Sequence, residues 1–473
     1  MYINGEWLKT EGSFSVFNPA NGEELGQVAD GNRHHAVMAI EAAHTAFSKW
    51  SCATAYKRSE CLYRAYELML ERKQQLAELM TREQGKPLKA SLNEVQYGAD
   101  FLRWYAEEAK RVYGETIPSA RPDQRFIVQQ KPIGVVAAIT PWNYPVSMIT
   151  RKVAPAIAAG CTIVLKPAEA TPLCAIAVFE ILHDAGIPAG VVNLVTSAVP
   201  KQIGEEFCTN ALVKKLTFTG STRVGKMLAQ DAAPQLKRVS MELGGHAPFI
   251  VFDDADPVHA AKGVALVKFL NTGQACISPN RIFVQRTILE PFLNTLKERV
   301  SKLKAGNGLI PGITIGPLVN QAAVDKVDHQ VVDALAKGAT LLHGGKRLTE
   351  TNMNNGHFYA PTLLSNVSAD MLIYREETFG PVAAVIAFDS EDEVLAMAND
   401  TNYGLAAYLY TQNLSRAMRI FEGLEFGIIG INDINPTSAA APFGGMKESG
   451  LGREGAREGI KEYLETKLGG FSI

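Results

Sequence analysis

Apolar residues recur every three to four positions through residues 33–113, a stretch rich in alanine, leucine and glutamate. Leu62, Ala65 and Met69 illustrate this spacing. Side chains three or four positions apart lie on one face of a helix, so an apolar stripe of this kind predicts helices that pack against a core. The opening part of the chain is therefore expected to be helical.

Beyond Pro122 the pattern changes to short apolar runs, which predict strands at residues 125–131 and 135–139 with a Pro-x-Gly turn between them. We expect these two strands to pair with each other. From residue 141 to 243 strands alternate with helices. The strands are predicted at 162–166, 191–195, 214–219 and 238–241. Strands that alternate with helices in this way imply a parallel sheet with helices on both faces.

The helix expected at residues 171–184 has signals at both of its ends. Thr171 is a favoured N-cap residue, and Pro172 stands at the first helical position, where a missing backbone N–H costs nothing. Gly186 and Pro188 follow the last helical turn and end the helix.

A second alternating region extends from residue 247 to about 442. Its strands are predicted at 249–252, 281–285, 340–343, 382–388, 406–410 and 427–431. The predicted fold class is therefore α/β, with two doubly wound domains. No long linker stands near Gly244, so the two domains should pack tightly, and the cleft between them is the natural ligand site.

The 473 residues, 47% hydrophobic and 20% charged, have the composition of an ordinary globular protein of two or three domains. A net charge of −2 provides no strong field for nucleic acid, and no apolar run approaches the ~20 residues that span a bilayer. We expect a cytoplasmic protein without nucleic-acid or membrane partners. Six cysteines without a Cys-x-x-Cys pair indicate reduced thiols, and nine scattered histidines predict no metal site.

Three side chains are candidates for covalent chemistry. Cys276 follows a turn that contains Gly273, so a substrate can approach its thiol, although most cysteines are inert core residues. Glu242 ends a predicted strand just before two glycines, where it can be a general base or simply a solvated loop charge. Asn143 lies between two prolines that stiffen the backbone, so its amide can be an oxyanion donor, although turn formation is the commoner role of asparagine.

A nucleotide site is indicated by the segment Phe218 to Met227, which nearly matches the phosphate-binding loop of nucleotide hydrolases. Met227 stands where that loop needs a hydroxyl for magnesium, so hydrolase chemistry is disfavoured. What remains is a strand, a glycine turn and a helix start, which suit a pyrophosphate. Lys166 and Glu169 can hold a ribose, and a carboxylate there favours NAD, but a helix-capping pair is an equal alternative.

Several motifs occur in the order that is typical of one family. Together they resemble the aldehyde dehydrogenase superfamily over residues 2–467. The motifs are Pro141-Trp142-Asn143, Lys166-Pro167-Ala168-Glu169, Phe218-Thr219-Gly220-Ser221, Glu242-Leu243-Gly244-Gly245, Gly273-Gln274-Ala275-Cys276, Glu377-Thr378-Phe379-Gly380-Pro381 and Pro442-Phe443-Gly444-Gly445.

The resemblance implies a role for each matching residue. Cys276 would be the nucleophile, Glu242 the base, and Asn143 with the backbone N–H of Cys276 the oxyanion hole. The cofactor would be NAD, with NADP as an alternative. The residues that would hold it are Trp142, Lys166, Glu169, Ser221, Gly225, Leu243, Glu377 and Phe379.

The family also implies a division of the chain. Residues 1–118 and 140–242 would form a Rossmann-like NAD(P)-binding domain, and residues 243–445 would form the catalytic domain. A small β element from residues 119–139 and 460–473 would join subunits into a homodimer or homotetramer.

Among subfamilies, residues 148–152 and 247–256 look most like succinate-semialdehyde dehydrogenases. Arg151 matches an arginine that pairs with the substrate carboxylate, and Thr437 stands at the position of a substrate-binding serine. However, Leu270 replaces a second arginine of that subfamily, and bidentate arginine contacts are hard to replace. Succinate semialdehyde or a similar small anionic aldehyde is expected, with lactaldehyde, sulfolactaldehyde or another short polar aldehyde as alternatives. A catalytically silent relative is disfavoured because all three candidate catalytic residues are present.

Overall fold

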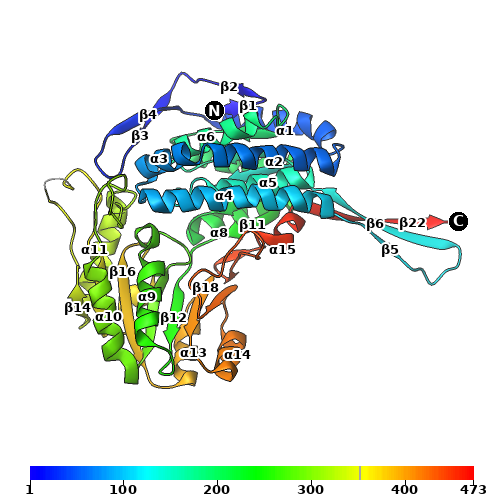
Figure 1. The fold of residues 1–473 in the computed structure, drawn as a ribbon. Helices are drawn as coiled ribbons and strands as arrows, with labels where there is room; N and C mark the ends of the chain where they lie inside the picture. The colour runs from blue at the N-terminus through cyan, green and yellow to red at the C-terminus, as the bar shows by residue number, and fades with distance from the viewer. Residues whose placement is uncertain (351–352) are drawn as a thin grey trace.

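The computed structural model describes residues 1–350 and 353–473. Their strands form one eight-stranded sheet, one seven-stranded sheet and three small antiparallel sheets. In Figure 1 the first half of the chain lies above and the seven-stranded sheet with its helices lies below. This arrangement confirms the predicted α/β class.

The eight-stranded sheet has a parallel centre. Each central strand is almost entirely buried, which explains why its sequence reads as a continuous apolar run. The four strands predicted between residues 141 and 243 are all present. In sheet order the strands are β2 (Glu6–Trp7), β1 (Tyr2–Ile3), β9 (Val192–Leu194), β8 (Thr162–Lys166), β7 (Val135–Ile139), β10 (Val213–Thr219), β11 (Arg238–Glu242) and β21 (Gly450–Leu451).

Helices cover both faces of this sheet. The predicted helical opening is confirmed as four helices, and Leu62, Ala65 and Met69 lie in the core beneath them. One face carries α5, α6 and, outside these, α2, α3 and α4, whereas α1, α7 and α8 cover the other face. The helices are α1 (Arg33–Trp50), α2 (Ala55–Glu71), α3 (Lys73–Gln84), α4 (Leu88–Glu108), α5 (Ser147–Ala159), α6 (Pro172–Asp184), α7 (Pro200–Thr209) and α8 (Thr222–Ala232).

The expected pairing of strands 125–131 and 135–139 is wrong. The first is β6 (Gln124–Pro132), which pairs with β5 (Glu115–Ile117) and β22 (Leu464–Ser472), whereas the second is β7 in the centre of the large sheet. Residues of β6 alternate between half-buried and exposed, but β7 is buried on both faces. Strands with such different surroundings belong to different sheets. The three-stranded sheet projects from the body of the molecule (Figure 1).

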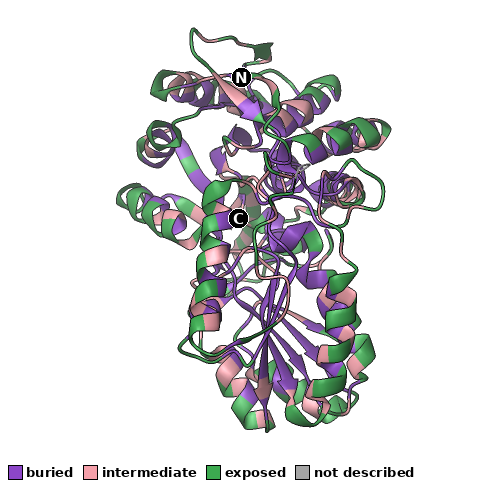
Figure 2. Ribbon diagram, turned by 90° about the vertical axis from the view of Figure 1, so that its left-hand side faces the viewer, coloured by how far each residue is buried: buried purple, intermediate pink, exposed green. Residues whose placement is uncertain are grey.

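The seven-stranded sheet contains the six predicted strands, each within two residues of its expected bounds. It adds one that was missed, β15, a run of only four residues after Pro361. Figure 2 shows this sheet buried between helices whose outer faces are exposed. In order the strands are β14 (Thr340–His343), β15 (Thr362–Ser365), β16 (Val382–Phe388), β13 (Pro279–Gln285), β12 (Ala247–Val251), β18 (Ala406–Tyr410) and β19 (Ile428–Ile431).

The elements that remain are helices around this second sheet and short pieces. None of the helices in the described residues is both long and apolar enough to cross a membrane. The helices are α9 (Pro257–Lys268), α10 (Leu289–Ser301), α11 (Gln321–Ala336), α12 (Leu372–Arg375), α13 (Glu391–Asn399), α14 (Leu414–Gly423) and α15 (Ala456–Lys461). The short pieces are η1 (Ala109–Arg111), η2 (Ala233–Gln235), η3 (Leu270–Gly273), η4 (Arg286–Ile288), β3 (Ser13–Phe17), β4 (Glu24–Ala29), β17 (Tyr403–Gly404) and β20 (Met446–Lys447).

Candidate active site

A cavity of about 260 Å³ is lined by segments from both large sheets. The loop after β7, the β10–α8 turn and the link between β11 and β12 contribute from one side, and the loop after η3 and residues 377–379 from the other. The cavity brings together seven of the residues that the sequence singled out, from positions up to 237 residues apart. They are Trp142, Asn143, Ser221, Leu243, Cys276, Glu377 and Phe379.

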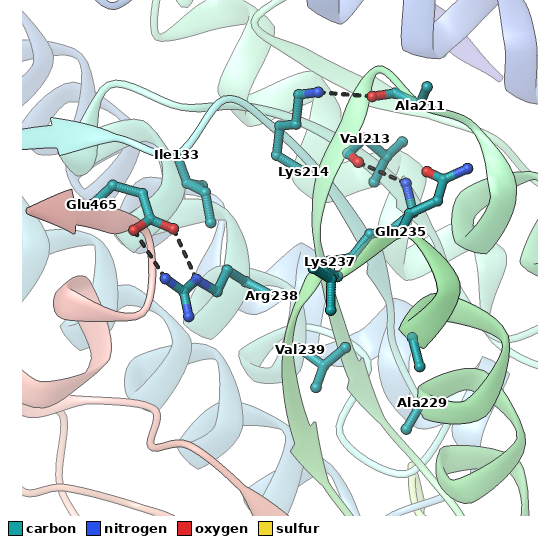
Figure 3. A pocket seen from close by; sticks show the side chains of 12 residues that line it. Ile133, Ala211, Val213, Lys214, Ala229, Gln235, Lys237, Arg238, Val239 and Glu465 are labelled. Carbon is teal, nitrogen blue, oxygen red and sulfur yellow. Dashed lines mark hydrogen bonds and ion pairs between the residues drawn. The ribbon is translucent and has the colours of Figure 1, made fainter.

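A larger cavity of about 760 Å³ lies between β10, η2 and the start of β22, and it contains none of these residues (Figure 3). Its cations already have partners. Arg238 pairs with Glu465 at 2.8 Å, and the ammonium of Lys214 donates to the Ala211 carbonyl at 2.9 Å. Lys237 donates to the Val213 carbonyl at 2.7 Å. We therefore place the candidate active site in the smaller cavity.

Cys276 is half-buried in the loop that follows η3. This loop is bent sharply, since Asn271 and Thr272 have positive φ angles of 49° and 60°. Gly273 lies so close to Gly380 that a Cβ would be 2.1 Å from its carbonyl oxygen, so only glycine fits there. Burial raises the pKa of the Cys276 thiol to about 12, although the nearby Arg151 guanidinium acts in the opposite direction.

Glu242 is the last residue of β11, and its side chain is buried. Within the described part of the chain its Oε2 has no hydrogen-bond partner. At Gly444 a Cβ would be 2.9 Å from Glu242 Oε1, so the absence of a side chain there makes room for the carboxyl group. Burial, followed by the charge of Glu454, raises the pKa of Glu242 well above its ordinary value. The Glu242 carboxyl therefore holds a proton more tightly than an exposed glutamate.

Glu454 is the ionised member of these two neighbouring carboxyl groups. Its Oε1 lies 2.5 Å from Lys152 Nζ, and its Oε2 lies 2.8 Å from Arg151 Nε. Burial alone would raise the pKa of Glu454, but the two cations outweigh burial and lower it. Two adjacent carboxylates rarely ionise together, so a charged Glu454 favours a protonated Glu242.

The loop that follows β7 holds Asn143, which is buried. Its side-chain Nδ2 donates to the Gln274 carbonyl at 3.0 Å. Its backbone carbonyl accepts hydrogen bonds from Lys86 Nζ at 2.7 Å and from Asn271 Nδ2 at 3.0 Å. An asparagine amide carries two hydrogens, so one remains for another acceptor.

The sequence interpretation missed Lys86, Asn271 and Glu94. A signal for two of them was present, because Glu94 falls on the apolar face of α4 between Ser91 and Val95 and Lys86 occupies a break between helices. A charged residue on an apolar helix face needs a buried partner, and Lys86 is that partner.

The residues expected to hold a dinucleotide lie around the start of α8 and the end of β8. Ser221 is the N-cap residue of α8, and its hydroxyl accepts from the Val224 N–H at 3.4 Å. At Gly225 a Cβ would be 2.3 Å from a terminal methyl group of Leu243, so a larger residue there would displace the Leu243 side chain. The rings of Trp142 and Phe379, which also line the cavity, meet edge to face with their centres 5.6 Å apart.

Lys166 and Glu169 form an ion pair at 3.0 Å, with the lysine buried and half of the glutamate side chain exposed. The alternative that this pair caps α6 is wrong. The carboxylate that accepts the first N–H groups of α6 belongs to Glu83 of α3, at 2.6 Å from the Leu173 nitrogen. Thr171 stands at the N-cap position but makes no side-chain cap bond, so its predicted capping role is also wrong. Glu377, across the cavity, accepts from the Gly245 N–H at 3.0 Å.

The residues expected to bind the substrate lie beside a tyrosine that the sequence did not single out. Arg151 is buried in α5, with its guanidinium 4.0 Å from the Phe443 ring centre. Its Nη2 and the hydroxyl of Tyr97 are buried without hydrogen-bond partners among the described residues. Burial raises the pKa of Tyr97, whereas the adjacent Arg151 and Thr437 lower it. Leu270, which stands where the resembled subfamily has a second arginine, is 44% exposed.

Comparison with known proteins adds an independent line of evidence. The model of the aldehyde dehydrogenase family matches residues 7–468, which confirms the resemblance predicted from the motifs. The chain is 50% identical to a glutarate-semialdehyde dehydrogenase of Pseudomonas putida over 468 residues, covering 98% of this chain and 96% of that protein. Identity is also 50% to an NADP-dependent succinate-semialdehyde dehydrogenase of Escherichia coli, with the same two coverages.

A 3-sulfolactaldehyde dehydrogenase of Pseudomonas putida is equally similar, at 50% identity over 99% of this chain and 96% of that protein. Among solved structures, an Escherichia coli NADP-dependent enzyme matches with a TM-score of 0.98 and 49% identity. That match covers 100% of this chain and 98% of the other.

Proposed function

The chain belongs to the aldehyde dehydrogenase family, as an NAD(P)-dependent enzyme similar to succinate-semialdehyde dehydrogenases, and we propose that its substrate is a small anionic semialdehyde. The observation that supports this substrate class is the buried guanidinium of Arg151. Its unpartnered Nη2, the Tyr97 hydroxyl and Thr437 lie together, and Arg151 also acts on the charge of Cys276. Unpartnered donors at a buried site fit an oxygen-rich end of a substrate.

The proposed reaction begins when the Cys276 thiol releases its proton to solvent, which the nearby Arg151 guanidinium favours, and the resulting thiolate attacks the aldehyde carbon. The second N–H of the Asn143 side chain and the backbone N–H of Cys276 stabilise the oxyanion that forms, and one such donor contributes about 10²–10³ in rate. The residues of the cavity would hold a dinucleotide, which would supply the acceptor for the hydride that leaves as the Cys276 adduct becomes a thioester. Glu242 then takes a proton from water, which attacks the thioester and releases a carboxylate and the Cys276 thiolate.

The residues present fit a dinucleotide. The N-terminus of α8 lies beside the cavity, where Gly220 and Ser221 line the wall, and the positive end of a helix dipole suits a phosphate. We propose that Trp142, Leu243, Glu377 and Phe379 enclose the reactive end, and that Lys166 and Glu169 contact a ribose. NAD is the expected cofactor because the Glu169 carboxylate can bind a ribose hydroxyl and repels a 2′-phosphate.

Replacing Glu169 with serine should shift this cofactor preference. The ratio of kcat/KM for NADP to that for NAD is expected to rise about tenfold or more, since loss of one charge repulsion of about 1.4 kcal/mol is a tenfold change. Steady-state rates with each cofactor measure it. Glu180→Ser, at an exposed position on α6, is the matched control and should leave the ratio unchanged. An unaltered ratio in Glu169→Ser would remove Glu169 from cofactor selection.

A panel of aldehydes tests the proposed substrate class. Succinate semialdehyde, glutarate semialdehyde and sulfolactaldehyde should each exceed an uncharged aldehyde of similar length in kcat/KM by about 10- to 100-fold, as expected for one hydrogen bond to a charged group. The kcat/KM for lactaldehyde should lie between the values for the three charged aldehydes and the value for the uncharged aldehyde. Equal rates with charged and uncharged aldehydes would contradict an anionic substrate.

A substitution at Leu270 can distinguish between succinate semialdehyde and sulfolactaldehyde as the substrate. A sulfonate spreads its charge over three oxygens, so a site with a single guanidinium favours sulfolactaldehyde as the second candidate. Leu270→Arg should raise kcat/KM for succinate semialdehyde by about tenfold, because it adds a second charged donor. No gain in this variant, together with a strong preference of the native enzyme for sulfolactaldehyde, would favour the second candidate.

We also propose that the three-stranded sheet of β5, β6 and β22 joins subunits into a dimer or tetramer. Large apolar side chains are exposed on it, including Leu468 at 61% and Phe471 at 50%. Such side chains favour burial against another copy of the chain. Because β7 lies in the eight-stranded sheet, the proposed element ends near Pro132 rather than at residue 139.

A further inference from the structure

A buried ion pair lies directly behind the loop that carries Asn143. Lys86 follows α3 through Gly85, whose φ is +94°, and its side chain is only 1% exposed. The ammonium donates to Glu94 and to the Asn143 carbonyl, the latter at 2.7 Å, and lies 4.0 Å from the Tyr144 ring centre. These three contacts of the ammonium are all with Glu94 or with the loop that carries Asn143.

Glu94 holds the other end of the same loop. Its Oε1 accepts the backbone N–H groups of Val146 at 3.0 Å and Ser147 at 3.2 Å, where α5 begins. Lys86 and Glu94 thus fix the loop at both ends from the α3–α4 segment. Replacing a buried ion pair by apolar side chains of the same volume is often neutral or stabilising, so overall stability is only a weak reason for an ion pair at this position.

We propose that Lys86, paired with Glu94, is a positioning residue that orients the Asn143 amide toward Cys276. This inference rests on the proposed role of Asn143 as the oxyanion donor. The other contacts of Asn143 run to the Cys276 loop itself, through Asn271 Nδ2 at 3.0 Å and the Gln274 carbonyl at 3.0 Å. Lys86 is the contact that fixes Asn143 relative to the scaffold outside that loop.

The expected consequence is kinetic. Without the ammonium, the Asn143 carbonyl keeps only the bond from Asn271, and the peptide can rotate together with the Cys276 loop. A displacement of about 1 Å in a catalytic group typically costs about 10²-fold in rate. Substrate binding is expected to change little, because the oxyanion exists only after the thiolate has attacked.

The test compares two variants that differ only in the Lys86 contact. Glu94→Gln keeps an oxygen for the Val146 and Ser147 N–H groups and keeps the Lys86 side chain, which loses its carboxylate partner but retains the Asn143 carbonyl as an acceptor. Lys86→Met/Glu94→Gln removes the ammonium without leaving a buried charge. Relative to Glu94→Gln, the double variant should lose about 10- to 100-fold in kcat, with KM for the aldehyde changed less than about threefold.

Combining the Lys86 substitution with Asn143→Ala distinguishes a positioning role of Lys86 from a purely structural one. Two proteins that already lack the Asn143 amide are compared, namely Asn143→Ala/Glu94→Gln and Asn143→Ala/Lys86→Met/Glu94→Gln. Their kcat values should be equal, because Lys86 acts through the amide that both have lost. Independent, multiplicative losses would overturn the proposal. If Asn143→Ala itself leaves kcat unchanged, the proposed oxyanion role fails instead, so the two failures are distinguishable.

The experiment has two further variants, a control and a substitute for the double variant. Lys302→Met/Glu298→Gln neutralises an exposed ion pair at the C-terminal end of α10 and should keep native kcat. If circular dichroism shows that the Lys86→Met/Glu94→Gln protein is unfolded, Lys86→Arg is measured in its place. Arginine keeps a positive charge beside Glu94 but places its hydrogen-bond donors at different positions from the Lys86 ammonium. The kcat of Lys86→Arg should fall at least about fivefold at unchanged KM, as expected for a misplaced contact. Native kcat in Lys86→Arg would overturn the proposal.

Discussion

Cys276→Ala is expected to lower steady-state aldehyde oxidation by about 10⁴-fold or more, as typically follows from loss of a covalent nucleophile. Cys276 is the only cysteine on the wall of the candidate cavity, as far as the described residues show, so no other thiol can replace it there. Alanine fills less space than cysteine and leaves the surrounding loop contacts intact. Dinucleotide binding, measured by fluorescence titration, should therefore remain within about threefold of native.

Cys52→Ala is the control, because Cys52 is exposed and lies on the surface of the first half of the chain. Its kinetic constants should equal those of the native enzyme. Intact-mass analysis supplies a second measurement, in which native protein quenched with acid during turnover gains an acyl group that Cys276→Ala lacks. Retained turnover in Cys276→Ala, or an acyl group still found on that variant, would contradict the assignment of the nucleophile.

Local sequence patterns predict the elements of this fold well because each pattern reports the surroundings of one strand or helix. The continuous apolar run of β7 and the three-to-four spacing of α2 both match what surrounds them. Which strands pair is not a local property. Strands β6 and β7 are separated by two residues, yet β6 pairs with β22, more than 300 residues later in the chain.

The same limit applies to the candidate site. Cys276 and Asn143 stand out because each follows a recognisable turn or strand, and Glu242 because it ends a strand just before two glycines. The structure brings Cys276 and Asn143 to one cavity and places Glu242 at the end of the adjoining strand β11. Their partners do not stand out. Lys86 contacts Asn143 across 57 positions, and Lys152 contacts Glu454 across 302. Only the packing of helices against the sheet brings such residues together.

A non-local contact can also displace a local rule. Thr171 has every local mark of an N-cap residue, but Glu83 reaches from α3 to the first N–H groups of α6 with both carboxylate oxygens. A carboxylate at a helix N-terminus accepts stronger hydrogen bonds than a hydroxyl does and also interacts with the helix dipole. Burial nevertheless raises the pKa of Glu83 to about 7.

Glu242→Gln should separate formation of the thioester from its hydrolysis. We expect the first turnover to release about one equivalent of NADH per active site, followed by a steady-state rate reduced about 10²- to 10⁴-fold, as for loss of a general base. The amide keeps the size of the carboxyl group but cannot take a proton from water. Stopped-flow absorbance at the NADH band measures both phases, and the exposed Glu425→Gln is the control, expected to behave as native.

The raised pKa of Glu242 also predicts the direction in which the hydrolysis rate changes with pH. Burial and then Glu454 raise the pKa of Glu242, so this group is protonated at pH values where an exposed glutamate is ionised. A general base acts only in its unprotonated form, and therefore the hydrolysis rate of the native enzyme should increase as pH rises through that elevated pKa. The increase should vanish from the slow phase of Glu242→Gln. A native-like slow phase in this variant, or a lost burst, would show that a different group activates the water.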